Sequence, residues 1–406
     1  METNDITFSI TPENLTHLLQ RATGNQSTQI REWEVQKLKG GLEYGSAIYR
    51  LQGSVVADGT VQSWSLILKT IQPDAQFDDP QGYRYWKRET QAYQSGLLQD
   101  LPGLVSAPCC YDIQEKPDGS VWIWLEDIQD EQEHPWPIER YAQVAHHLGR
   151  FNGTYLVGHP LPSDTWVAHD WLRTYLHHAA PMVEFIRRNP THPIVQSMLP
   201  GIALPLTLAC WKERARMLKV LDELPQTFCH QDAFGRNLFY RREQVVAIDW
   251  SFSGIAPVGA ELAPLIGAAF GLARFPSSQA KELDQACFEG YLEGLRQAGW
   301  KPDRWQVRVG YTLTMFLRNT FGAAIGEMLP GLLDEQTRSH WVEGVGGPPE
   351  QVGETDAGIA AYYQSIAMEA LKLLGLGSMV RVIGRTAYYG IRLAGKRRDN
   401  TTKIAQ

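Results

Sequence analysis

The sequence predicts an α+β fold with a small, mainly β N-terminal lobe and a larger, mainly α C-terminal lobe. Up to about residue 128, five segments alternate apolar and polar residues, as the strands of a half-buried sheet do, and one helical segment is inserted among them. Beyond residue 128, apolar residues recur at helical spacing. One short strand pair on either side of residues 241–244 interrupts these helices.

The first lobe begins with a helix after Thr11 and Pro12, because threonine caps helices well and proline is tolerated in the first turn. A hairpin is predicted around Asp58-Gly59, which separates two alternating runs. A second strand pair flanks the turn at residues 117–119. The predicted strands are 32–37, 47–56, 61–71, 105–115 and 120–128, and the inserted helix is 83–98.

The second lobe is predicted to contain mainly helices. They run over 138–156, 166–188 and 209–221, and a further series extends from residue 260 to about 393. The last stretch mixes apolar and basic residues, which permits either a helix on a membrane surface or a terminal helix packed on the lobe with a basic tail.

Composition limits the class of protein. The chain has 406 residues, which suggests two or three packed units, and no apolar run reaches the roughly 20 residues needed to span a bilayer. Its net charge is −7, and because the segment from Leu376 onward is basic, the preceding body is more acidic still. An acidic body disfavours nucleic-acid binding and mildly favours a neutral or cationic small substrate.

Localisation is predicted from the N-terminus and the cysteines. The first residues are polar and acidic, which fits neither a signal nor a transit peptide. Five cysteines are present without the spacing of a disulfide framework or a metal site. We therefore expect a cytoplasmic protein.

The segment 228–250, FCHQDAFGRNLFYRREQVVAIDW, carries the strongest chemical signal. It holds His230, Asp232, Asn237 and, at the end of an apolar run, Asp249. One carboxylate can orient an acceptor hydroxyl and take its proton, while an amide oxygen and a second carboxylate can hold Mg²⁺ beside phosphates. His230 is better explained as a residue that packs and fixes the loop.

These residues resemble the aminoglycoside phosphotransferase and choline kinase superfamily, which shares its fold with protein kinases. HQDAFGRN is similar to the family's His-x-Asp-x-x-x-x-Asn loop, and AIDW is similar to its metal motif. The resemblance implies a two-lobed protein-kinase-like fold, with Asp232 as catalytic base and Asn237 and Asp249 as Mg²⁺ ligands. It continues through residues 251–266, where Glu261 stands in place of a more usual aspartate.

The resemblance also implies an ATP site in the first lobe. Lys69, in a predicted strand, stands where the family keeps a lysine for the α- and β-phosphates, and Glu89 stands where its partner glutamate lies. A carboxylate keeps such a lysine charged and correctly aimed. The chain would then divide into a nucleotide-binding lobe, 1–128, and a catalytic and acceptor-binding lobe, 129–406.

Two further segments are expected to contact the nucleotide. Glycines 40, 41 and 45 lie between the first two strands, where backbone N–H groups could approach a triphosphate, although a plain turn explains Gly41 and Gly45 nearly as well. The run VWIWLEDI resembles the family's hinge, so that backbone atoms of Glu126, Asp127 and Ile128 would receive adenine.

The acceptor is expected to be a small molecule. Phe234 occupies the position where protein kinases usually have a lysine, and only about ten residues separate Asp249 from the next helical segment, too few for an activation segment. Candidate acceptor contacts are the helix 305–328 and the acidic and aromatic residues Asp130, Glu131, Glu133 and Trp136. Such residues suit an amine-bearing or quaternary ammonium compound, but they also fit a helical core and a solvated loop.

The function predicted is therefore an ATP- and Mg²⁺-dependent kinase that phosphorylates a hydroxyl of an aminoglycoside-like molecule, an amino alcohol or another alcohol. Two alternatives stay open: a nucleotide-binding pseudokinase or regulatory module, and a metal-dependent hydrolase built on His230, Asp232 and Asp249. The sequence does not identify the acceptor, the choice between ATP and GTP, or the oligomeric state.

Overall fold

The computed structural model describes residues 10–38, 45–130, 136–271, 275–339 and 357–376. The chain forms two compact units. The first contains Met1–Gln132, Pro162–Ala168 and Asn237–Ser253, and the second contains Glu133–Leu161, His169–Arg236 and Gly254–Gln406. Two segments from the later part of the chain thus belong to the first unit, in addition to the residues before the predicted division at 128.

The first unit contains a five-stranded antiparallel sheet with the order β1-β2-β3-β6-β5. The strands are β1 Gln29–Lys37, β2 Ser46–Ala57, β3 Thr60–Ile71, β5 Cys110–Glu115 and β6 Val121–Glu126. The β2–β3 turn has positive φ at both Asp58 and Gly59, 49° and 77°, which a tight two-residue hairpin requires. The predicted hairpin is therefore present.

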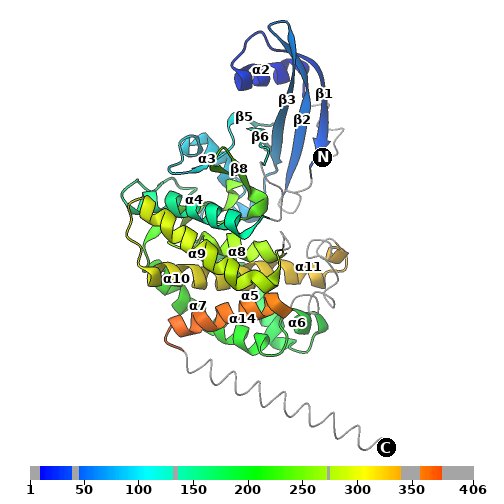
Figure 1. Cartoon of the computed structure of the whole chain (residues 1–406). Helices are drawn as coiled ribbons and strands as arrows, with labels where there is room; N and C mark the ends of the chain where they lie inside the picture. The colour runs from blue at the N-terminus through cyan, green and yellow to red at the C-terminus, as the bar shows by residue number, and fades with distance from the viewer. Residues whose placement is uncertain (1–9, 39–44, 131–135, 272–274, 340–356, 377–406) are drawn as a thin grey trace, which may run out of the picture. The chain divides into compact units, whose positions relative to one another are not determined.

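Helix α2, Pro12–Thr23, covers one face of this sheet in the first unit (Figure 1). Thr11 caps it by accepting a hydrogen bond from the backbone N–H of Asn14 at 3.3 Å, as its position before Pro12 predicts. The buried face of α2, with Leu15, Leu18 and Leu19, packs in one hydrophobic cluster with apolar residues of β2, β3 and β6.

Two predicted elements of this unit are shorter than expected. The helix predicted over 83–98 is α3, Arg88–Gln94, because Gly96 adopts the left-handed conformation at φ 78° and residues 83–87 form turns. The predicted strand 105–115 is divided at its proline into β4, Val105–Ser106, and β5.

A second, three-stranded sheet of the first unit has the order β4-β9-β8. Strands β8, Leu238–Arg241, and β9, Gln244–Ala247, form the predicted late hairpin. Its turn residues Arg242 and Glu243 both have positive φ, at 50° and 62°. Strand β4 pairs with β9 in parallel, so this hairpin is tied to the early part of the chain.

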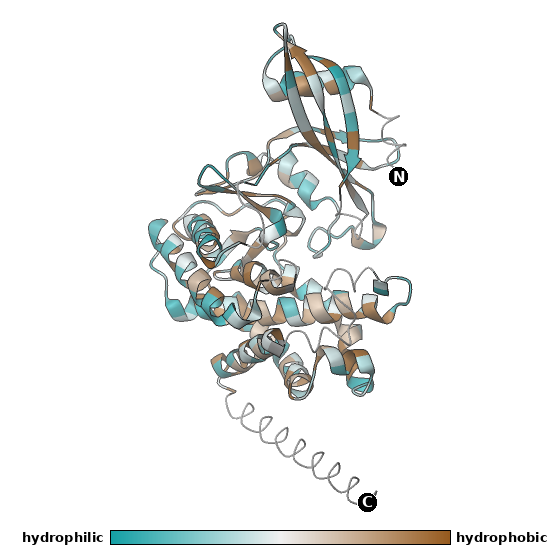
Figure 2. Ribbon diagram, turned by 45° about the vertical axis from the view of Figure 1, so that its right-hand side comes forward, coloured by the Kyte–Doolittle hydropathy of each residue, from teal (hydrophilic) through white to brown (hydrophobic). Residues whose placement is uncertain are grey.

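The second unit is mainly helical, with one two-stranded sheet of β7 and β10. Figure 2 shows helices of this unit that carry both hydrophobic and hydrophilic residues, as amphipathic helices around a core do. The elements are α4 Ile138–Leu156, α5 Trp171–Arg188, α6 Pro193–Met198, α7 Ala203–Asp222, β7 Gln226–Cys229, β10 Gly254–Pro257, α8 Leu262–Gly271, α9 Ala280–Gln297, α10 Arg304–Met315, the π-helix η7 Phe316–Met328, α11 Leu329–Leu333 and α14 Ala357–Leu373.

Glycines allow two helix pairs of this unit to pack closely. Helices α4 and α9 lie side by side (Figure 1), and a Cβ on Gly294 would lie 2.0 Å from the carbonyl oxygen of His146. Helices α5 and η7 meet at Gly322, where a Cβ would lie 2.2 Å from the Tyr175 ring. Larger side chains at these positions would push the helices apart.

The helix predicted over 166–188 begins at Trp171. Residues 166–168 belong instead to the first unit, where the carbonyl of Trp166 accepts from Arg88 at 3.1 Å and that of Val167 accepts from Gln81 at 3.0 Å. The predicted helix 209–221 lies within α7. The predicted helical stretch after residue 376, including the basic tail, lies outside the described residues.

No helix among the described residues has the length and apolar character that a membrane span requires. All five cysteines lie within the described part of the chain, and each is free.

Candidate functional site

Lys69 and Glu89 form a buried ion pair in the first unit. Lys69 projects from β3 in a stretch paired with both β2 and β6, and Glu89 lies in the first turn of α3. The Nζ of Lys69 is 2.5 Å from Oε2 of Glu89, and their side chains are 8% and 2% exposed. The two residues singled out from the sequence are thus brought together, while their contact with a nucleotide stays a prediction.

Asp249 is the second partner of Lys69. Its Oδ1 lies 3.0 Å from the lysine Nζ and also accepts a hydrogen bond from the Ser251 hydroxyl at 2.7 Å. The Asp249 side chain is 37% exposed, so this end of the cluster reaches solvent. The φ of Asp249 is 62°, a left-handed conformation that costs free energy for a residue other than glycine and is often found at functional sites.

The pKa values of Lys69 and Glu89 are set by burial and by the opposite charges within the cluster of Lys69, Glu89 and Asp249. Burial acts to lower the pKa of Lys69, but the nearby carboxylates of Asp249 and Glu89 outweigh it and raise that pKa above its ordinary value. Burial raises the pKa of Glu89, and the charge of Lys69 opposes this rise. The lysine is therefore held as a cation whose ammonium group points at Asp249.

Asn237 and Asp249 are brought to the same end of the β8–β9 hairpin. The backbone carbonyl of Asn237 accepts a hydrogen bond from the N–H of Ile248 at 2.9 Å, and Leu238 pairs with Ala247 in the next register position. Asn237 is 8% exposed. The hairpin therefore sets an amide side chain and a carboxylate at neighbouring positions.

This donor set fits Mg²⁺. Carboxylate and amide oxygens are ligands that this ion accepts, and Mg²⁺ is commonly bound through one or two carboxylates together with substrate phosphates. The described residues contain no group of three or more histidine, cysteine or acidic side chains placed to hold a metal ion. Two protein ligands, Asn237 and Asp249, with the remaining positions taken by a nucleotide, would be consistent with this donor set and with the lack of a larger cluster in the described residues.

Arg88, next to Glu89 on α3, is a buried residue that sequence reasoning missed. Its guanidinium donates to five backbone carbonyls at 2.6–3.3 Å. They belong to Pro80, Gly82, Tyr83, Trp166 and Ser251. Arg88 therefore joins the start of α3 to the segment that follows Asp249. Burial lowers its pKa to about 10.

Asp232 lies in the second unit, in the loop that follows β7, and its approach to Asn237 and Asp249 stays a prediction. Its backbone N–H donates to Nδ1 of His230 at 3.2 Å, and His230 is buried. The preceding residue, Gln231, has a φ of 62° and donates its backbone N–H to Oε1 of Glu261 at 2.8 Å. His230 and Glu261 thus both hold the loop that carries Asp232.

The carboxylate of Asp232 also pairs with Arg318. Nη2 of Arg318, in η7, is 2.6 Å from Oδ1 of Asp232. The predicted acceptor helix 305–328 includes this residue, but the sequence did not indicate that it would reach Asp232. The two residues are 86 positions apart in the sequence, so no local pattern indicates their contact.

Glu261 is a buried acid beside the loop that carries Asp232. Burial raises the pKa of this carboxyl to about 7, and the N–H of Gln231 opposes the rise. Because the folded-state pKa lies above the ordinary value of 4.5, the stability linked to this group is complete below about pH 4.5 and is lost as the pH rises through 7.

We therefore expect Glu261→Gln to flatten the pH dependence of the free energy of unfolding between pH 5 and 8. The amide keeps an oxygen for Gln231 and cannot ionise. The wild-type protein should lose up to about 3 kcal/mol from this group across that range. Urea denaturation at several pH values measures the difference, with Glu282→Gln, on the exposed face of α9, as the control. Equal slopes for Glu261→Gln and the wild type would contradict the assignment.

The other residues predicted to touch the nucleotide are placed as follows. Gly45 adopts φ 69°, and its carbonyl accepts the N–H of Gln72 at 2.9 Å; Gly40 and Gly41 lie outside the described residues. The N–H of Glu126 donates to the carbonyl of Cys109 at 2.9 Å. The carboxylate of Asp127 accepts two hydrogen bonds from Arg50, at 2.8 and 3.1 Å.

Among the candidate acceptor contacts, Trp136 is 1% exposed and packs edge-on against Tyr141 at 5.4 Å between ring centroids. It is therefore a core residue of the second unit. Oδ1 of Asp130 accepts the backbone N–H of Tyr240 at 3.1 Å in the first unit. Glu131 and Glu133 lie outside the described residues.

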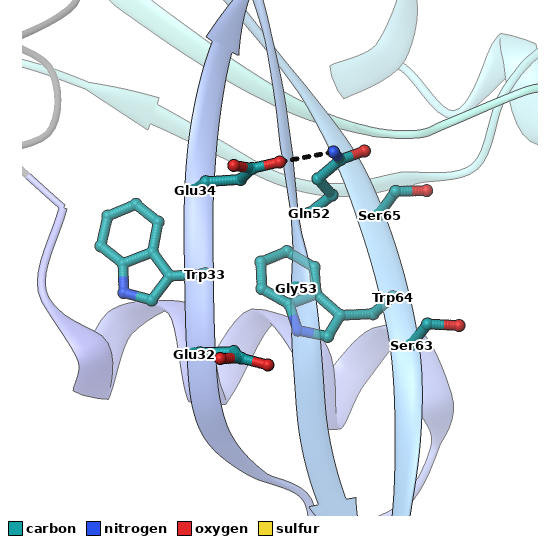
Figure 3. A pocket seen from close by; sticks show the side chains of 8 residues that line it. All are labelled: Glu32, Trp33, Glu34, Gln52, Gly53, Ser63, Trp64 and Ser65. Carbon is teal, nitrogen blue, oxygen red and sulfur yellow. Dashed lines mark hydrogen bonds between the residues drawn. The ribbon is translucent and has the colours of Figure 1, made fainter.

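An open pocket of about 650 Å³ lies on the sheet formed by β1, β2 and β3 (Figure 3). Its lining includes Glu34, which accepts a hydrogen bond from Gln52 at 2.7 Å, and Trp64, whose ring lies beside Gly53. None of the residues predicted to bind a nucleotide or to catalyse a reaction lines it. It is a feature of the sheet surface, separate from the lysine–carboxylate cluster.

The sheet with its lysine–glutamate pair and the mainly helical second unit together define a two-lobed, protein-kinase-like fold. Two solved structures share it. A choline kinase from Cryptosporidium parvum Iowa II has a TM-score of 0.53 and 13% identity, over 90% of this chain and 99% of that chain. An amicoumacin kinase in complex with AMP-PNP, Ca²⁺ and Ami has a TM-score of 0.50 and 12% identity, over 79% of this chain and 88% of that chain. At such identities the likeness concerns the fold alone.

A family model described as "Phosphotransferase enzyme family" matches residues 98–305, just over half of the chain. The chain belongs to this family. The match includes Asp232, Asn237 and Asp249, but Lys69 and Arg318 lie outside it. A search of curated protein sequences found no significant match.

Proposed function

We propose that this protein transfers the γ-phosphoryl group of ATP to a hydroxyl group of a small molecule, with Mg²⁺ as the metal. The observation that carries the proposal is the cluster of the buried Lys69 and Glu89 with the partly exposed Asp249, in a chain of the phosphotransferase family. A cation fixed by two carboxylates costs desolvation free energy, and phosphate binding gives a reason for that cost.

In the proposed reaction, Lys69 binds the α- and β-phosphates of ATP, and Glu89 keeps its ammonium group aimed. Asn237 and Asp249 would hold Mg²⁺, which neutralises charge on the phosphates when bound. Backbone atoms of Asp127 and Ile128 would contact the adenine, since the N–H of Glu126 is engaged with Cys109. Gly41 and Gly45 would cover the phosphates.

Asp232 acts on the acceptor. Its carboxylate accepts a hydrogen bond from the hydroxyl and takes the proton as the hydroxyl oxygen attacks the γ-phosphorus. The bond between that phosphorus and the bridging oxygen breaks, so ADP and a phosphate ester are formed. The proton is then on Asp232, the phosphoryl group is on the acceptor, and ADP is the leaving group.

A small acceptor is favoured over a protein acceptor by the short segment after Asp249. It passes through one 3₁₀ turn, Trp250–Phe252, and the short strand β10 before α8 begins at Leu262. All residues of this segment are described, and a peptide-binding activation segment does not fit within it. The two similar structures are a choline kinase and an amicoumacin kinase, and both names agree with a small acceptor.

The alternatives are less well supported. A pseudokinase needs no base, so the buried and tightly held loop around Asp232 would have no purpose in it. A metal-dependent hydrolase would need further ligands, and the described residues hold no suitable cluster. The cytoplasmic location is part of the proposal and rests on the sequence.

The direct test is a mass-spectrometric screen for ATP- and Mg²⁺-dependent products across aminoglycosides, macrolides, amino alcohols and sugars. We expect one class of acceptor to gain the mass of a phosphoryl group, and we expect a chelator to prevent this. Binding of Mg·ATP without turnover on any acceptor would favour the regulatory alternative. Release of phosphate to water alone would favour the hydrolase.

A further inference from the structure

Arg318 makes a contact that the proposed reaction does not yet use. Its side chain is nearly buried, at 11% exposed, and that of its partner Asp232 is 17% exposed. A guanidinium–carboxylate contact of 2.6 Å in such surroundings is a charge-assisted hydrogen bond little weakened by water.

The position of Arg318 is fixed from several sides. Its guanidinium carbon lies 5.7 Å from the centre of the Trp171 ring on α5, a cation–π distance. Its Nη1 donates to Oδ1 of Asn319 at 3.1 Å. Nδ2 of Asn319 in turn donates to the carbonyl of Ala263 on α8 at 3.1 Å. The guanidinium is thus held by two neighbouring helices as well as by its own.

The helix that carries Arg318, η7, also packs closely against α5. Arg318 lies four residues before Gly322, whose missing side chain leaves room for Tyr175, and four residues further Gly326 packs against Ala179. These small residues hold η7 close against α5. The π-helical backbone of η7 is rare, and such segments occur frequently at functional sites.

Arg308 offers a comparison in the preceding helix. It forms ion pairs with Asp284 at 2.6 Å and Glu369 at 2.7 Å, and so ties α9, α10 and α14 together. Both partners of Arg308 lie on helices, so its two ion pairs are explained by their contribution to the stability of the helix packing. The partner of Arg318 instead lies on the loop that carries the family's catalytic motif.

We propose that Arg318 is a positioning residue for Asp232: it fixes the orientation of the carboxylate that takes the proton from the acceptor hydroxyl. This inference rests on the proposed function. An aspartate side chain rotates freely unless held, and misplacement of a reacting group by about 1 Å can cost about 10²-fold in rate. The planar guanidinium of an arginine matches the geometry of a carboxylate, so it suits this role.

The test compares kcat and KM in wild type, Arg318→Lys and Arg318→Met. We expect kcat to fall about 10²-fold in Arg318→Met with the KM for ATP unchanged, and to recover partly in Arg318→Lys, because ammonium keeps the charge but loses the planar geometry. Arg308→Met is the matched control: it removes a half-buried arginine from ion pairs of the same unit and should lower stability without the same loss of kcat.

A double-mutant cycle separates positioning from general damage. If Arg318 acts through Asp232, Arg318→Met should reduce kcat much less in an Asp232→Asn background than in the wild type. Equal losses in both backgrounds, or a loss no greater than that of Arg308→Met, would overturn the inference. A wild-type protein that phosphorylates no acceptor would overturn the proposed function first, so the two failures are distinguishable.

Discussion

Asp232→Asn is expected to lower kcat about 10²–10⁴-fold, the range that a lost general base produces. Asparagine is the informative replacement because its amide oxygen can still accept the hydrogen bond from Arg318. Alanine would leave the buried guanidinium of Arg318 without its partner, which costs about 3–5 kcal/mol in comparable cases and would mix instability with lost chemistry. Initial rates with an acceptor identified by mass spectrometry measure the effect.

The control for this variant is Asp222→Asn. Asp222 is also an aspartate of the second unit that pairs with an arginine, Arg173, but both side chains are largely exposed. Its replacement should leave kcat and the unfolding midpoint almost unchanged. If Asp232→Asn retained wild-type kcat while remaining folded, Asp232 would not be the base.

Arg88→Met is expected to have the largest effect on stability. Five backbone carbonyls would lose this donor, although that of Gly82 would keep the N–H of Tyr85 at 3.3 Å. An unsatisfied buried polar group costs about 1–3 kcal/mol. Relaxation and entry of water would reduce the total, so we expect a loss of about 3–5 kcal/mol, as when a buried charged network is broken. The free energy of unfolding in urea measures it.

Two further variants make this result specific. Arg88→Lys keeps the charge but has only three donors for five carbonyls, so it should lie between methionine and the wild type. Arg21→Gln removes an exposed arginine of the same unit that pairs with Asp112, and it should change stability by less than about 1 kcal/mol. A loss below about 1 kcal/mol in Arg88→Met would show that these hydrogen bonds are dispensable.

Much of the fold could be predicted because its signals are local. The β2–β3 hairpin follows from Asp58-Gly59, two residues suited to positive φ, and α2 follows from a capping threonine. Asp232, Asn237 and Asp249 could be predicted as site residues because one short segment holds them all. The pairing of Lys69 with Glu89 could be predicted because the lysine lies in a strand and the glutamate lies in the helix that follows it.

The features that were missed depend on contacts between distant parts of the chain. Residues 83–87 have a composition that permits a helix, but the carbonyl of Tyr83 and, just before it, those of Pro80 and Gly82 accept hydrogen bonds from the Arg88 guanidinium. The carbonyl of Trp166, 78 positions away, also accepts a hydrogen bond from Arg88. Because of this contact, Trp166 does not belong to α5. Arg318 reaches Asp232 only because η7 is folded against α5. None of these contacts leaves a periodic pattern in the sequence.

The central claim is that two aspartates have different tasks, one for the metal and nucleotide and one for the acceptor. Calorimetric titration of ATP in the presence and absence of Mg²⁺, with Asp249→Asn and Asp232→Asn compared against the wild type, tests it most directly. We expect Asp249→Asn to lose the Mg²⁺-dependent part of ATP binding and Asp232→Asn to retain it while its kcat falls about 10²–10⁴-fold. Full Mg²⁺-dependent binding in Asp249→Asn, or its loss in Asp232→Asn, would contradict this division of roles.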